Sequence, residues 1–508
     1  MLDNLWAGLL TIFQWQNILA MLAGVTAGQL VGAVPGFTVT MTIAILLPVT
    51  YYLPPVFSIL LLLGIYKGGC YGGSIPAILV NAPGTPAASA TMIDGHPMAK
   101  KGQSRKALKM ALYASVSADT MSDIVLLLVA GALATIAMKF GPPEFFALVL
   151  FSLTIIGGLT GKSVLKGMIS ACFGLFIATV GLDPTTAVPR FTLGIYEIES
   201  GFALVPTMIG LFVMSEIFQQ VEAGVEKGRL TVFKDSPKPE DNRISKEEWK
   251  RSIPAILQST VIGTFIGAIP GLGPTISTFL GYGQAQRISK HPEKFGTGVI
   301  EGVAAAEAGN SAACGATMIP LLSLGIPGDV STAVLVGAFM LHGLRPGPIL
   351  FEQHASFVYA ILVGQLVCNL VNLIVGQGTM RAYAKIVTSI PRLYLYPIVW
   401  ALCIIGSYAI NANMFDVYSV LFFGLIGYAF RKTEIPLIPM LIAFILSPML
   451  EVKLRQALII SDGNLAVFYS KPLALAFMIA TLLMVLYLVY SRVMKNKKAN
   501  ADRGPVGQ

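Results

Sequence analysis

The amino-acid sequence predicts an all-α polytopic membrane protein that is built from two inverted-topology repeats with re-entrant hairpins and discontinuous helices. Three observations support this prediction. The chain has 508 residues, of which 55% are hydrophobic and only 12% are charged, whereas soluble domains carry about 25% charged residues. Two sequence motifs recur in the second half of the chain, and the basic residues change sides between matching loops.

The charges and the cysteines argue against several other classes of protein. The formal net charge is +9, but the basic residues cluster in short loops between apolar runs. That pattern is typical of cytoplasmic orientation signals rather than of nucleic-acid binding. The five cysteines lie in apolar segments and include no Cys-x-x-Cys pair. We therefore expect neither a disulfide framework nor a metal site.

Residues 1–17 are expected to form an N-terminal interfacial helix. This stretch contains no basic residue, so it lacks the positive region of a cleaved signal peptide. Trp6 and Trp15 are the kind of side chains that anchor a helix at the membrane surface.

Two ordered motifs indicate a duplication. The first motif has Gly28, Gly32, Pro35 and Gly36, matched by Gly263, Gly267, Pro270 and Gly271 at an offset of 235. The second motif has Cys70, Pro76, Pro83 and Gly84, matched by Cys314, Pro320, Pro327 and Gly328 at an offset of 244. A single Gly-x-x-x-Gly would be weak evidence because membrane helices use small residues for packing. Two motifs at constant offsets are typical of internal repeats.

The loops predict that the two repeats have opposite orientations. After the first motif, the loop 50–55 of repeat one is uncharged, whereas the matching loop of repeat two carries Arg287, Lys290 and Lys294. After the second motif the bias reverses, because repeat one has five basic residues between 100 and 109 and repeat two has only Arg345. The positive-inside rule places matching loops on opposite faces, as in many inverted-repeat membrane proteins.

Each repeat is expected to begin with a re-entrant hairpin. Repeat one covers residues 18–220 and repeat two covers 253–450, and their first apolar segments are 18–50 and 253–284. The arms on either side of Pro35-Gly36 and Pro270-Gly271 are too short to cross about 30 Å of hydrocarbon at about 1.5 Å per residue. A hairpin with Pro-Gly at its tip fits this pattern, and a single kinked, tilted span is the alternative.

The next segment of each repeat, 56–93 or 297–340, is expected to be a broken helix because it is too long for one straight span. The centres read Lys67–Pro76 and Asn81–Pro86 in repeat one, and Glu307–Ser311 and Ser323–Asp329 in repeat two. These stretches predict unwound backbone. Such backbone is tolerated at membrane depth only where protein or a water-filled cavity covers it.

Conventional spans make up the rest of both repeats. They are expected near 110–138, 144–160, 167–182 and 202–220, and near 355–380, 393–411, 416–430 and 433–449. Residues 221–252 are interpreted as a cytoplasmic polar linker, and residues 471–508 as a final span and a basic cytoplasmic tail. Counted from a periplasmic N-terminus, these spans put the C-terminus in the cytoplasm, as its basic residues require.

Two hairpin tips and two helix breaks should converge near the bilayer midplane and form a binding site. Half-helix N-termini there suit a carboxylate, and unwound carbonyls and hydroxyls suit a sodium ion. The candidate substrate- or ion-binding residues are Pro35, Gly36, Thr38, Lys67, Ser74, Asn81, Pro83, Gly84, Thr85, Gly271, Thr275, Asn310, Ser311, Ser323, Pro327, Gly328 and Asp329. Any single Ser or Thr among them is more simply explained by a bond to its own helix backbone.

No catalytic residue is expected. The sequence contains neither His-Glu-x-x-His nor a Gly-x-x-x-x-Gly-Lys-Ser/Thr loop, which argues against an intramembrane metalloprotease and against an ATP-driven pump. No cofactor is expected, and a transported Na+ ion is the one candidate metal.

Ionisable residues within the apolar segments are the sharpest functional candidates, because charges at membrane depth are costly. Lys67 is expected to neutralise an anionic substrate, or else to pair with a carboxylate or snorkel. Lys67 and Asp329 should meet at the shared site, either as a pair or through a ligand group. Asp119 and Asp123 are interpreted as helix-packing or interfacial residues, with a proton-relay role as the alternative.

Several stretches resemble the large membrane (permease) subunit of the tripartite tricarboxylate transporters. They are Gly32–Gly36, Tyr71–Ala88, Asp94–Gly102, Gly267–Gly273 and Ser323–Gly328, and the similarity spans nearly the whole chain. The resemblance implies a bacterial inner-membrane location, a small four-span membrane partner and a periplasmic solute-binding protein. It also implies import of carboxylates such as citrate, driven by a gradient of Na+ or H+.

Lys67, Ser311 and Asp329 depart from the family pattern, so an amino- or hydroxy-acid remains an alternative to a tricarboxylate. We expect the hairpins and broken helices to move against a scaffold, as in an elevator-like transporter. A channel is a weaker alternative because hairpins that close on one site from two sides favour alternating access. An intramembrane enzyme is also weaker because no buried nucleophile–base pair is evident in the sequence.

Overall fold

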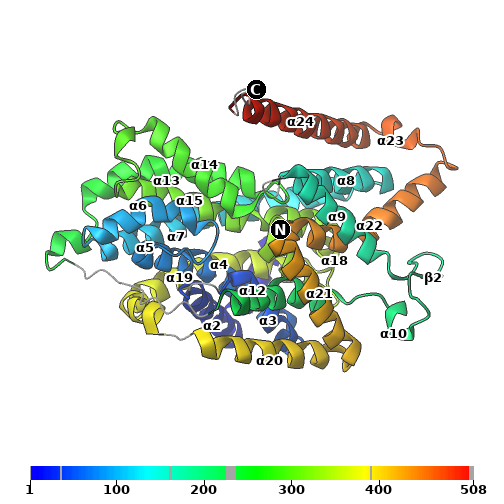
Figure 1. Ribbon diagram of the computed structural model, residues 1–508, viewed down its shortest axis with the longest axis horizontal. Helices are drawn as coiled ribbons and strands as arrows, with labels where there is room; N and C mark the ends of the chain where they lie inside the picture. The colour runs from blue at the N-terminus through cyan, green and yellow to red at the C-terminus, as the bar shows by residue number, and fades with distance from the viewer. Residues whose placement is uncertain (1, 35–36, 160–162, 225–235, 390–391, 503–508) are drawn as a thin grey trace, which may run out of the picture. The chain divides into compact units, whose positions relative to one another are not determined.

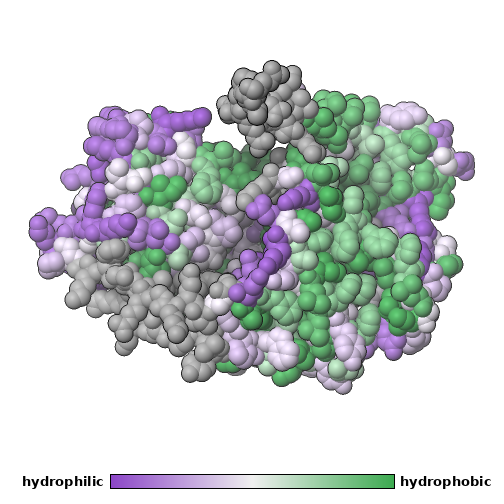
Figure 2. Space-filling model, in the orientation of Figure 1, coloured by the Kyte–Doolittle hydropathy of each residue, from purple (hydrophilic) through white to green (hydrophobic). Residues whose placement is uncertain are grey.

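The computed structural model describes residues 2–34, 37–159, 163–224, 236–389 and 392–502, and these are helical almost throughout (Figure 1). Within them, seven helices are long and apolar enough to cross a membrane, or up to eight if one bent pair is a single span. Hydrophobic residues cover much of the face shown in Figure 2. The predicted all-α polytopic membrane fold is therefore confirmed.

The chain divides into two compact units, which we describe separately. Unit 1 comprises Met1–Ala137 and Val205–Leu425, and unit 2 comprises Met138–Leu204 and Ile426–Gln508. The hairpins and the broken helices of both repeats all lie in unit 1.

Unit 1 begins with α1 (Leu2–Ile12) and α2 (Trp15–Gly32), which meet at a bend of 71°. Helix α2 packs closely along α4 (Pro55–Gly72). A Cβ on Gly28 or Gly32 would lie 2.3 or 2.9 Å from a backbone carbonyl oxygen of α4. The Gly-x-x-x-Gly of the first motif thus allows two helix backbones to touch.

The broken helices have matching boundaries in the two repeats. In repeat one they are α4, α5 (Ser74–Val80) and α6 (Ala88–Lys100), and in repeat two they are α15 (Ile300–Ala316), α16 (Met318–Leu324) and α17 (Val330–Leu341). The ends of α4 and α15, and both ends of α5 and α16, fall 244 residues apart. The residues after α5 and α16, Asn81 (φ 60°) and Gly325 (φ 76°), are equivalent and both left-handed, which ends a helix.

The position of the unwound backbone confirms the prediction for Asn81–Pro86 and for most of Ser323–Asp329, and corrects it for Lys67–Pro76 and Glu307–Ser311. Helix α4 runs unbroken through Lys67, and α15 runs unbroken through Glu307–Ser311. The non-helical segments are 81–87 and 325–329. The glycines after Lys67 serve packing instead, because a Cβ on Gly68 would lie 2.3 Å from the carbonyl oxygen of Val25.

The first segment of repeat two is an antiparallel hairpin. Helices α13 (Lys246–Gly267) and α14 (Gly273–Ile288) flank the turn at 268–272, and they lie side by side in Figure 1. A Cβ on Gly281 would lie 2.8 Å from Oγ of Ser259, so residues equally far from the turn face each other. In repeat one, α3 (Val39–Thr50) follows α2, and Pro35 and Gly36 lie outside the described residues.

The last span of each repeat packs on helices of the other repeat. In unit 1, α11 (Leu204–Met208), the π-helix η1 (Ile209–Met214) and α12 (Ser215–Ala223) form one span. In η1, a Cβ on Gly210 would lie 2.7 Å from Cβ of Phe423 in α21. In unit 2, a Cβ on Gly174 of α9 would lie 2.1 Å from the carbonyl oxygen of Met440 in α22.

The remaining elements complete the chain. They are α7 (Ser104–Ala137), α8 (Pro142–Leu159), α9 (Val164–Ala178), β1 (Gly181–Leu182), β2 (Pro189–Arg190), α10 (Tyr196–Glu199), η2 (Pro239–Asn242), η3 (Pro292–Lys294), α18 (Pro348–Gln353), α19 (Ala355–Ser389), α20 (Arg392–Asn411), α21 (Met414–Lys432), α22 (Leu437–Ile460), α23 (Val467–Ser470) and α24 (Pro472–Asp502). The short β1–β2 hairpin was not predicted.

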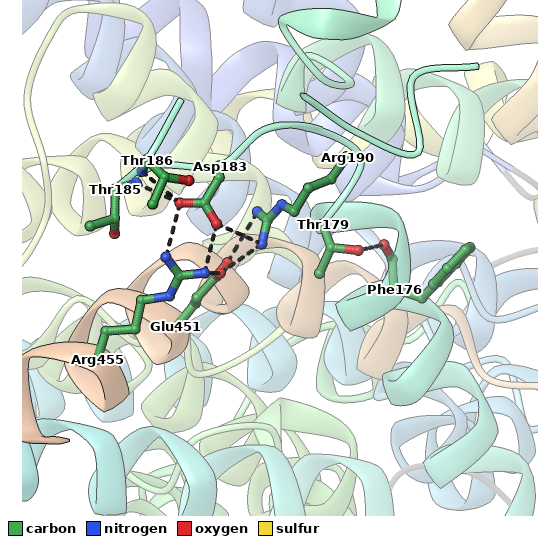
Figure 3. Close-up of polar contacts among 8 residues, drawn as sticks. All are labelled: Phe176, Thr179, Asp183, Thr185, Thr186, Arg190, Glu451 and Arg455. Atoms are coloured by element: carbon green, nitrogen blue, oxygen red, sulfur yellow. Dashed lines mark hydrogen bonds and ion pairs between the residues drawn. The ribbon is translucent and has the colours of Figure 1, made fainter. Parts of the chain in front are cut away.

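A four-residue ion network in unit 2 joins the β1–β2 hairpin to α22 (Figure 3). Arg455 donates to both carboxylate oxygens of Asp183, at 2.9 and 2.6 Å, and to Glu451 at 2.8 Å. Arg190 donates to Glu451 at 2.7 Å and lies 3.3 Å from Asp183. The backbone N–H groups of Thr185 and Thr186 also donate to Asp183. Loop and helix are therefore held by bidentate, charge-assisted bonds.

Replacement of Asp183 by asparagine is expected to lower the melting temperature of the purified protein. The Arg455 guanidinium and the backbone amide of Thr186 hold the pKa of Asp183 well below its usual value, which is about 3.9. Because the pKa is lower in the folded state, the ionised Asp183 stabilises the protein at every pH above about 4. This stabilisation is lost only as the pH falls further. The difference in melting temperature should thus stay constant from about pH 5 to pH 8. Asp462→Asn, at an exposed aspartate, is the control and should leave the melting temperature unchanged. An Asp183→Asn variant that melts at the wild-type temperature at pH 7 would show that the network does not stabilise the protein.

Candidate functional site

In each repeat, the unwound loop inside the broken helix, 81–87 or 325–329, packs against residues of the first motif. The Gly271 N–H, in the turn of the α13–α14 hairpin, donates to the Gly328 carbonyl at 2.8 Å. In repeat one, the Gly84 N–H donates to the Gly73 carbonyl at 3.0 Å. A Cβ on Gly84 would lie 2.2 Å from the carbonyl oxygen of Gly32. These glycines allow backbone to approach backbone, which leaves no room for a side chain.

The broken helix of repeat one contacts the start of α17 in repeat two. The Tyr66 hydroxyl donates to Oδ2 of Asp329 at 2.9 Å and lies 3.2 Å from Oγ1 of Thr317. Nearby, the hydroxyls of Thr40 and Ser331 are 2.9 Å apart. The two repeats therefore meet where α16 ends and α17 begins.

Asp329 caps α17 and places a negative charge at its positive end. Its Oδ1 accepts from the Thr332 N–H at 2.8 Å, and the Thr332 hydroxyl bonds back to the Asp329 N–H at 2.9 Å. This capping box satisfies the free donors of the first turn. The N-terminus of α17 is thus already occupied by a carboxylate of the chain itself.

The equivalent position in repeat one is neutral. Thr85 lies 244 residues before Asp329, is half-buried, and accepts from the Ala88 N–H at 3.3 Å at the start of α6. The positive end of α6 therefore has no carboxylate cap. The two matching helix ends differ by one negative charge, which makes only the α6 end attractive to an anion.

Glu307 links α15 to repeat one. Its side chain is fully buried, and Oε1 accepts from the hydroxyls of Ser74 and, at 2.5 Å, Thr91. The other oxygen, Oε2, has no hydrogen-bond partner among the described residues. Three residues later in α15, the Asn310 side-chain amide donates to the carbonyl of Cys70 at 3.3 Å. A buried carboxylate with one unused oxygen marks a place where a ligand or proton can bind.

Lys67 has a different partner from the one predicted. Its Nζ lies 2.7 Å from Oδ1 of Asp119 and 2.7 Å from Oδ2 of Asp123. All three side chains are buried. The expectation that Lys67 pairs with Asp329 was therefore wrong, whereas the alternative that Lys67 pairs with a carboxylate is confirmed. Asp119 and Asp123 are buried helix-packing residues, as one of the two interpretations had it, and are not interfacial. Because α4 is regular at this point, Tyr66 and Lys67 point about 100° apart around its axis, and only Tyr66 faces Asp329.

The cysteines also correct a prediction. Cys70 and Cys314 form a disulfide bond, although no disulfide framework was expected. They are equivalent positions of the two repeats, and equivalent residues touch only near the axis that relates two similar units. Counting local Cys spacing could not reveal this pair, since the partners are 244 residues apart.

The other candidate residues differ in their surroundings: two bond only to their own helix, one bonds across the repeats, and the rest are exposed, half-buried or buried. Thr38 caps α3 by accepting from Met41, and Ser323 donates to the carbonyl of Ile319 in its own helix. The hydroxyls of Ser115 and Ser311 are 2.6 Å apart. Asn81 and Thr275 are exposed, Pro83 is half-buried, and Pro327 and Gly328 are buried. A separate cavity of about 520 Å³ lies beside Tyr113 and Trp249, and Lys246 and Lys250 also line it.

Comparison with known proteins supplies independent information. Residues 18–442 match the model of the tripartite tricarboxylate transporter TctA family. The chain is 38% identical over 476 residues to an uncharacterized 52.8 kDa protein in the TAR-I ttuC' 3' region of Agrobacterium vitis, with 93% of each chain covered. It is also 38% identical over 212 residues to an uncharacterized protein in the TAR-II ttuC' 3' region of that organism, covering 42% of this chain and 87% of that protein. No solved structure matches the chain.

Proposed function

This chain belongs to the tripartite tricarboxylate transporter TctA family, and from that premise we propose that it is the large permease subunit of a binding-protein-dependent secondary importer of organic acids. Its partners are a small four-span membrane subunit and a periplasmic solute-binding protein that delivers the substrate. It lies in a bacterial inner membrane, with the N-terminus periplasmic and the C-terminus cytoplasmic. A cation gradient drives uptake, and the chain itself catalyses no chemical reaction.

The observation that best supports the substrate class is the unequal charge of the two matching helix ends. The neutral N-terminus of α6, at Thr85, favours a carboxylate of the substrate. The N-terminus of α17 already carries Asp329, which repels a further carboxylate but accepts hydrogen bonds. A hydroxyl or amino group suits that end. We therefore favour a hydroxy- or amino-acid over a simple tricarboxylate.

The same contacts support transport by alternating access. Hydrogen bonds from Tyr66 to Asp329 and from Ser74 to Glu307 join the broken helices of the two repeats. A buried apolar cluster that contains residues of both repeats, such as Ile78 and Val303, packs beside these bonds. We infer that the hairpins and broken helices move together against the remaining helices, in the manner of inverted-repeat transporters.

Asp329→Asn tests the proposed selectivity. Asparagine still caps a helix, so the fold is expected to persist while the negative charge is removed. Uptake of labelled tricarballylate, a tricarboxylate without a hydroxyl group, relative to labelled malate should rise about tenfold or more, which corresponds to about 1.4 kcal/mol. The measurement is uptake by cells that express all three subunits.

The matched control is Asp416→Asn, at a buried aspartate in the first turn of α21 that accepts from Asn411. This variant should leave the ratio of tricarballylate to malate uptake unchanged. If Asp329→Asn also leaves this uptake ratio unchanged, Asp329 does not face the substrate.

A further inference from the structure

Lys67, Asp119, Asp123 and Asn369 form a buried polar cluster between α4, α7 and α19. Lys67 Nζ lies 2.7 Å from each aspartate, and the Asn369 side-chain amide donates to Oδ2 of Asp123 at 2.7 Å. Each of the four side chains is at most 3% exposed. The cluster is distinct from the helix ends at Thr85 and Asp329.

The charges of this cluster do not balance. Two carboxylates face one ammonium group, so the ionised cluster carries a net charge of −1. A net buried charge is costly unless a counter-charge or a proton removes it. One more positive charge would make the cluster neutral.

The cluster also contains atoms that lack a hydrogen-bond partner. Oδ1 of Asp123 and Oδ1 of Asn369 have none among the described residues, and neither has the side chain of Gln365, one turn earlier on α19. Buried polar atoms are nearly always paired, so each exception points to a missing proton, water or ion. The missing charge and the missing hydrogen-bond partners occur at the same place.

The position of Lys67 favours a proton over a metal ion. Its ammonium group already lies between the two carboxylates, in the place that a bound cation would take. Among the described residues, the oxygens left without a partner are one each from Asp123, Asn369 and Gln365, which is fewer than the about six oxygen ligands that hard cations take. A proton needs only one acceptor.

Few other titratable groups face the cluster. Helix α4 adds Tyr66, which is bonded to Asp329, and α19 adds the thiol of Cys368. Helix α15 meets the two aspartates with Gly315, where a Cβ would lie 2.7 and 2.8 Å from their Oδ1 atoms. Helix α16 has no titratable residue. Near the start of α7, Lys106 pairs with Glu248 of α13.

We propose that this cluster binds the proton whose gradient drives transport, with Oδ1 of Asp123 as the acceptor; the inference rests on the proposed function, in which a cation gradient supplies the energy. Proton binding forms one O–H bond on Asp123 and breaks none within the protein, and the proton comes from water on one side of the membrane. The cluster then changes from a net charge of −1 to neutral.

Two short backbone connections link the cluster to the substrate site. Tyr66 directly precedes Lys67 in α4, and its hydroxyl donates to Asp329. Gly315, which the aspartates contact, lies two residues before Thr317, whose hydroxyl is 3.2 Å from that of Tyr66. A shift of α4 or α15 on protonation therefore reaches both Asp329 and the break between α15 and α16.

Infrared spectroscopy of the purified full-length protein tests the proton without any substrate. A protonated carboxylic acid has its own carbonyl stretching band, distinct from that of a carboxylate. At pH 7, Asp123→Asn should remove a band that the wild type shows, because Lys67 and Asp119 then balance. Lys67→Met should strengthen the band by a second protonated carboxyl group, and Lys67→Met with Asp123→Asn should return it to the wild-type strength. Glu307→Gln is measured as well, because it removes any separate carboxylic-acid band that Glu307 contributes.

The infrared spectra distinguish a proton-binding cluster from an ionised or sodium-binding one. Loss of the carboxylic-acid band in Asp123→Asn supports the proton site. A wild-type spectrum without this band, or a band that NaCl abolishes and choline chloride does not, would overturn the proposal in favour of an ionised or sodium-binding cluster.

Transport by the three-subunit complex in vesicles separates this inference from the proposed function. Using labelled malate and citrate, Asp123→Asn should lose uptake driven by a pH gradient but keep exchange of labelled for unlabelled substrate. Gradient-driven uptake at the wild-type level by Asp123→Asn would also overturn the proton site. If the wild type exchanges no acid from a panel of mono-, di-, tri-, hydroxy- and aminocarboxylates while the band behaves as expected, the proposed function fails and the proton-binding site stands.

Discussion

Lys67→Met is expected to destabilise the folded protein by about 3–5 kcal/mol, the usual cost of removing one partner of a buried ion pair. The variant leaves Asp119 and Asp123 buried without a cation. Heating the detergent-solubilised protein and measuring the fraction that stays monodisperse reports this loss. Because protons neutralise buried carboxylates, both proteins should become more stable as the pH falls, and the variant more steeply, since its cluster takes up two protons where that of the wild type takes up one.

The rescue and the control make this expectation specific. Adding Asp123→Asn to Lys67→Met removes one of the stranded charges and should recover part of the stability. Lys101→Met, at an exposed lysine that donates only to a backbone carbonyl of Thr297, should cost less than about 0.5 kcal/mol. Equal stability of Lys67→Met and wild type would mean that the buried ion pair does not exist.

Gly84→Ala is expected to have the second-largest effect on stability. Its Cβ would lie 2.2 Å from the carbonyl oxygen of Gly32 and 2.9 Å from Cα of Gly73. Backbone cannot give way as a flexible side chain can, so α2 and the loop 81–87 must separate. We expect a loss of about 1–3 kcal/mol, the usual range for an overpacked site, together with a large loss of transport.

Gly283→Ala provides a matched control for the same chemical change. Gly283 lies in helix α14, and a Cβ there would meet no atom within 4 Å. Alanine should therefore be neutral or slightly stabilising, because it favours the helix. Thermal melting and transport of both variants are compared. A Gly84→Ala variant that melts and transports like Gly283→Ala would refute the close backbone contact between the two motifs of repeat one.

The sequence predicted the helices better than it predicted which side chains meet. Constant offsets between the motifs identified equivalent positions, and the boundaries of α5 and α16 fall at those positions. The partner of Lys67 depends on the rotation of α4 about its axis, which the residue types alone do not specify. The i, i+4 spacing of Asp119 and Asp123 was an available signal, because such residues share one helix face.

The charge asymmetry of the site was readable in part. Asp329 stood out as a charge within an apolar segment, but its role as the cap of α17 follows from the backbone around it. The disulfide between Cys70 and Cys314 depends on the tertiary arrangement of the two repeats. Two unwound stretches were expected in each broken helix, and only the later one is unwound. At the earlier one, the glycines of α4 and α15 serve close helix packing.

Counterflow in proteoliposomes tests the central claim most directly. The purified chain, reconstituted with its small membrane subunit and supplied with its binding protein, is loaded with one unlabelled acid from a panel of mono-, di-, tri- and hydroxycarboxylates. The same labelled acid is then added outside in trace amount. Our account predicts a transient accumulation above equilibrium for at least one carboxylate. Simple equilibration without overshoot would indicate a channel, and the absence of flux for every carboxylate would contradict an organic-acid permease.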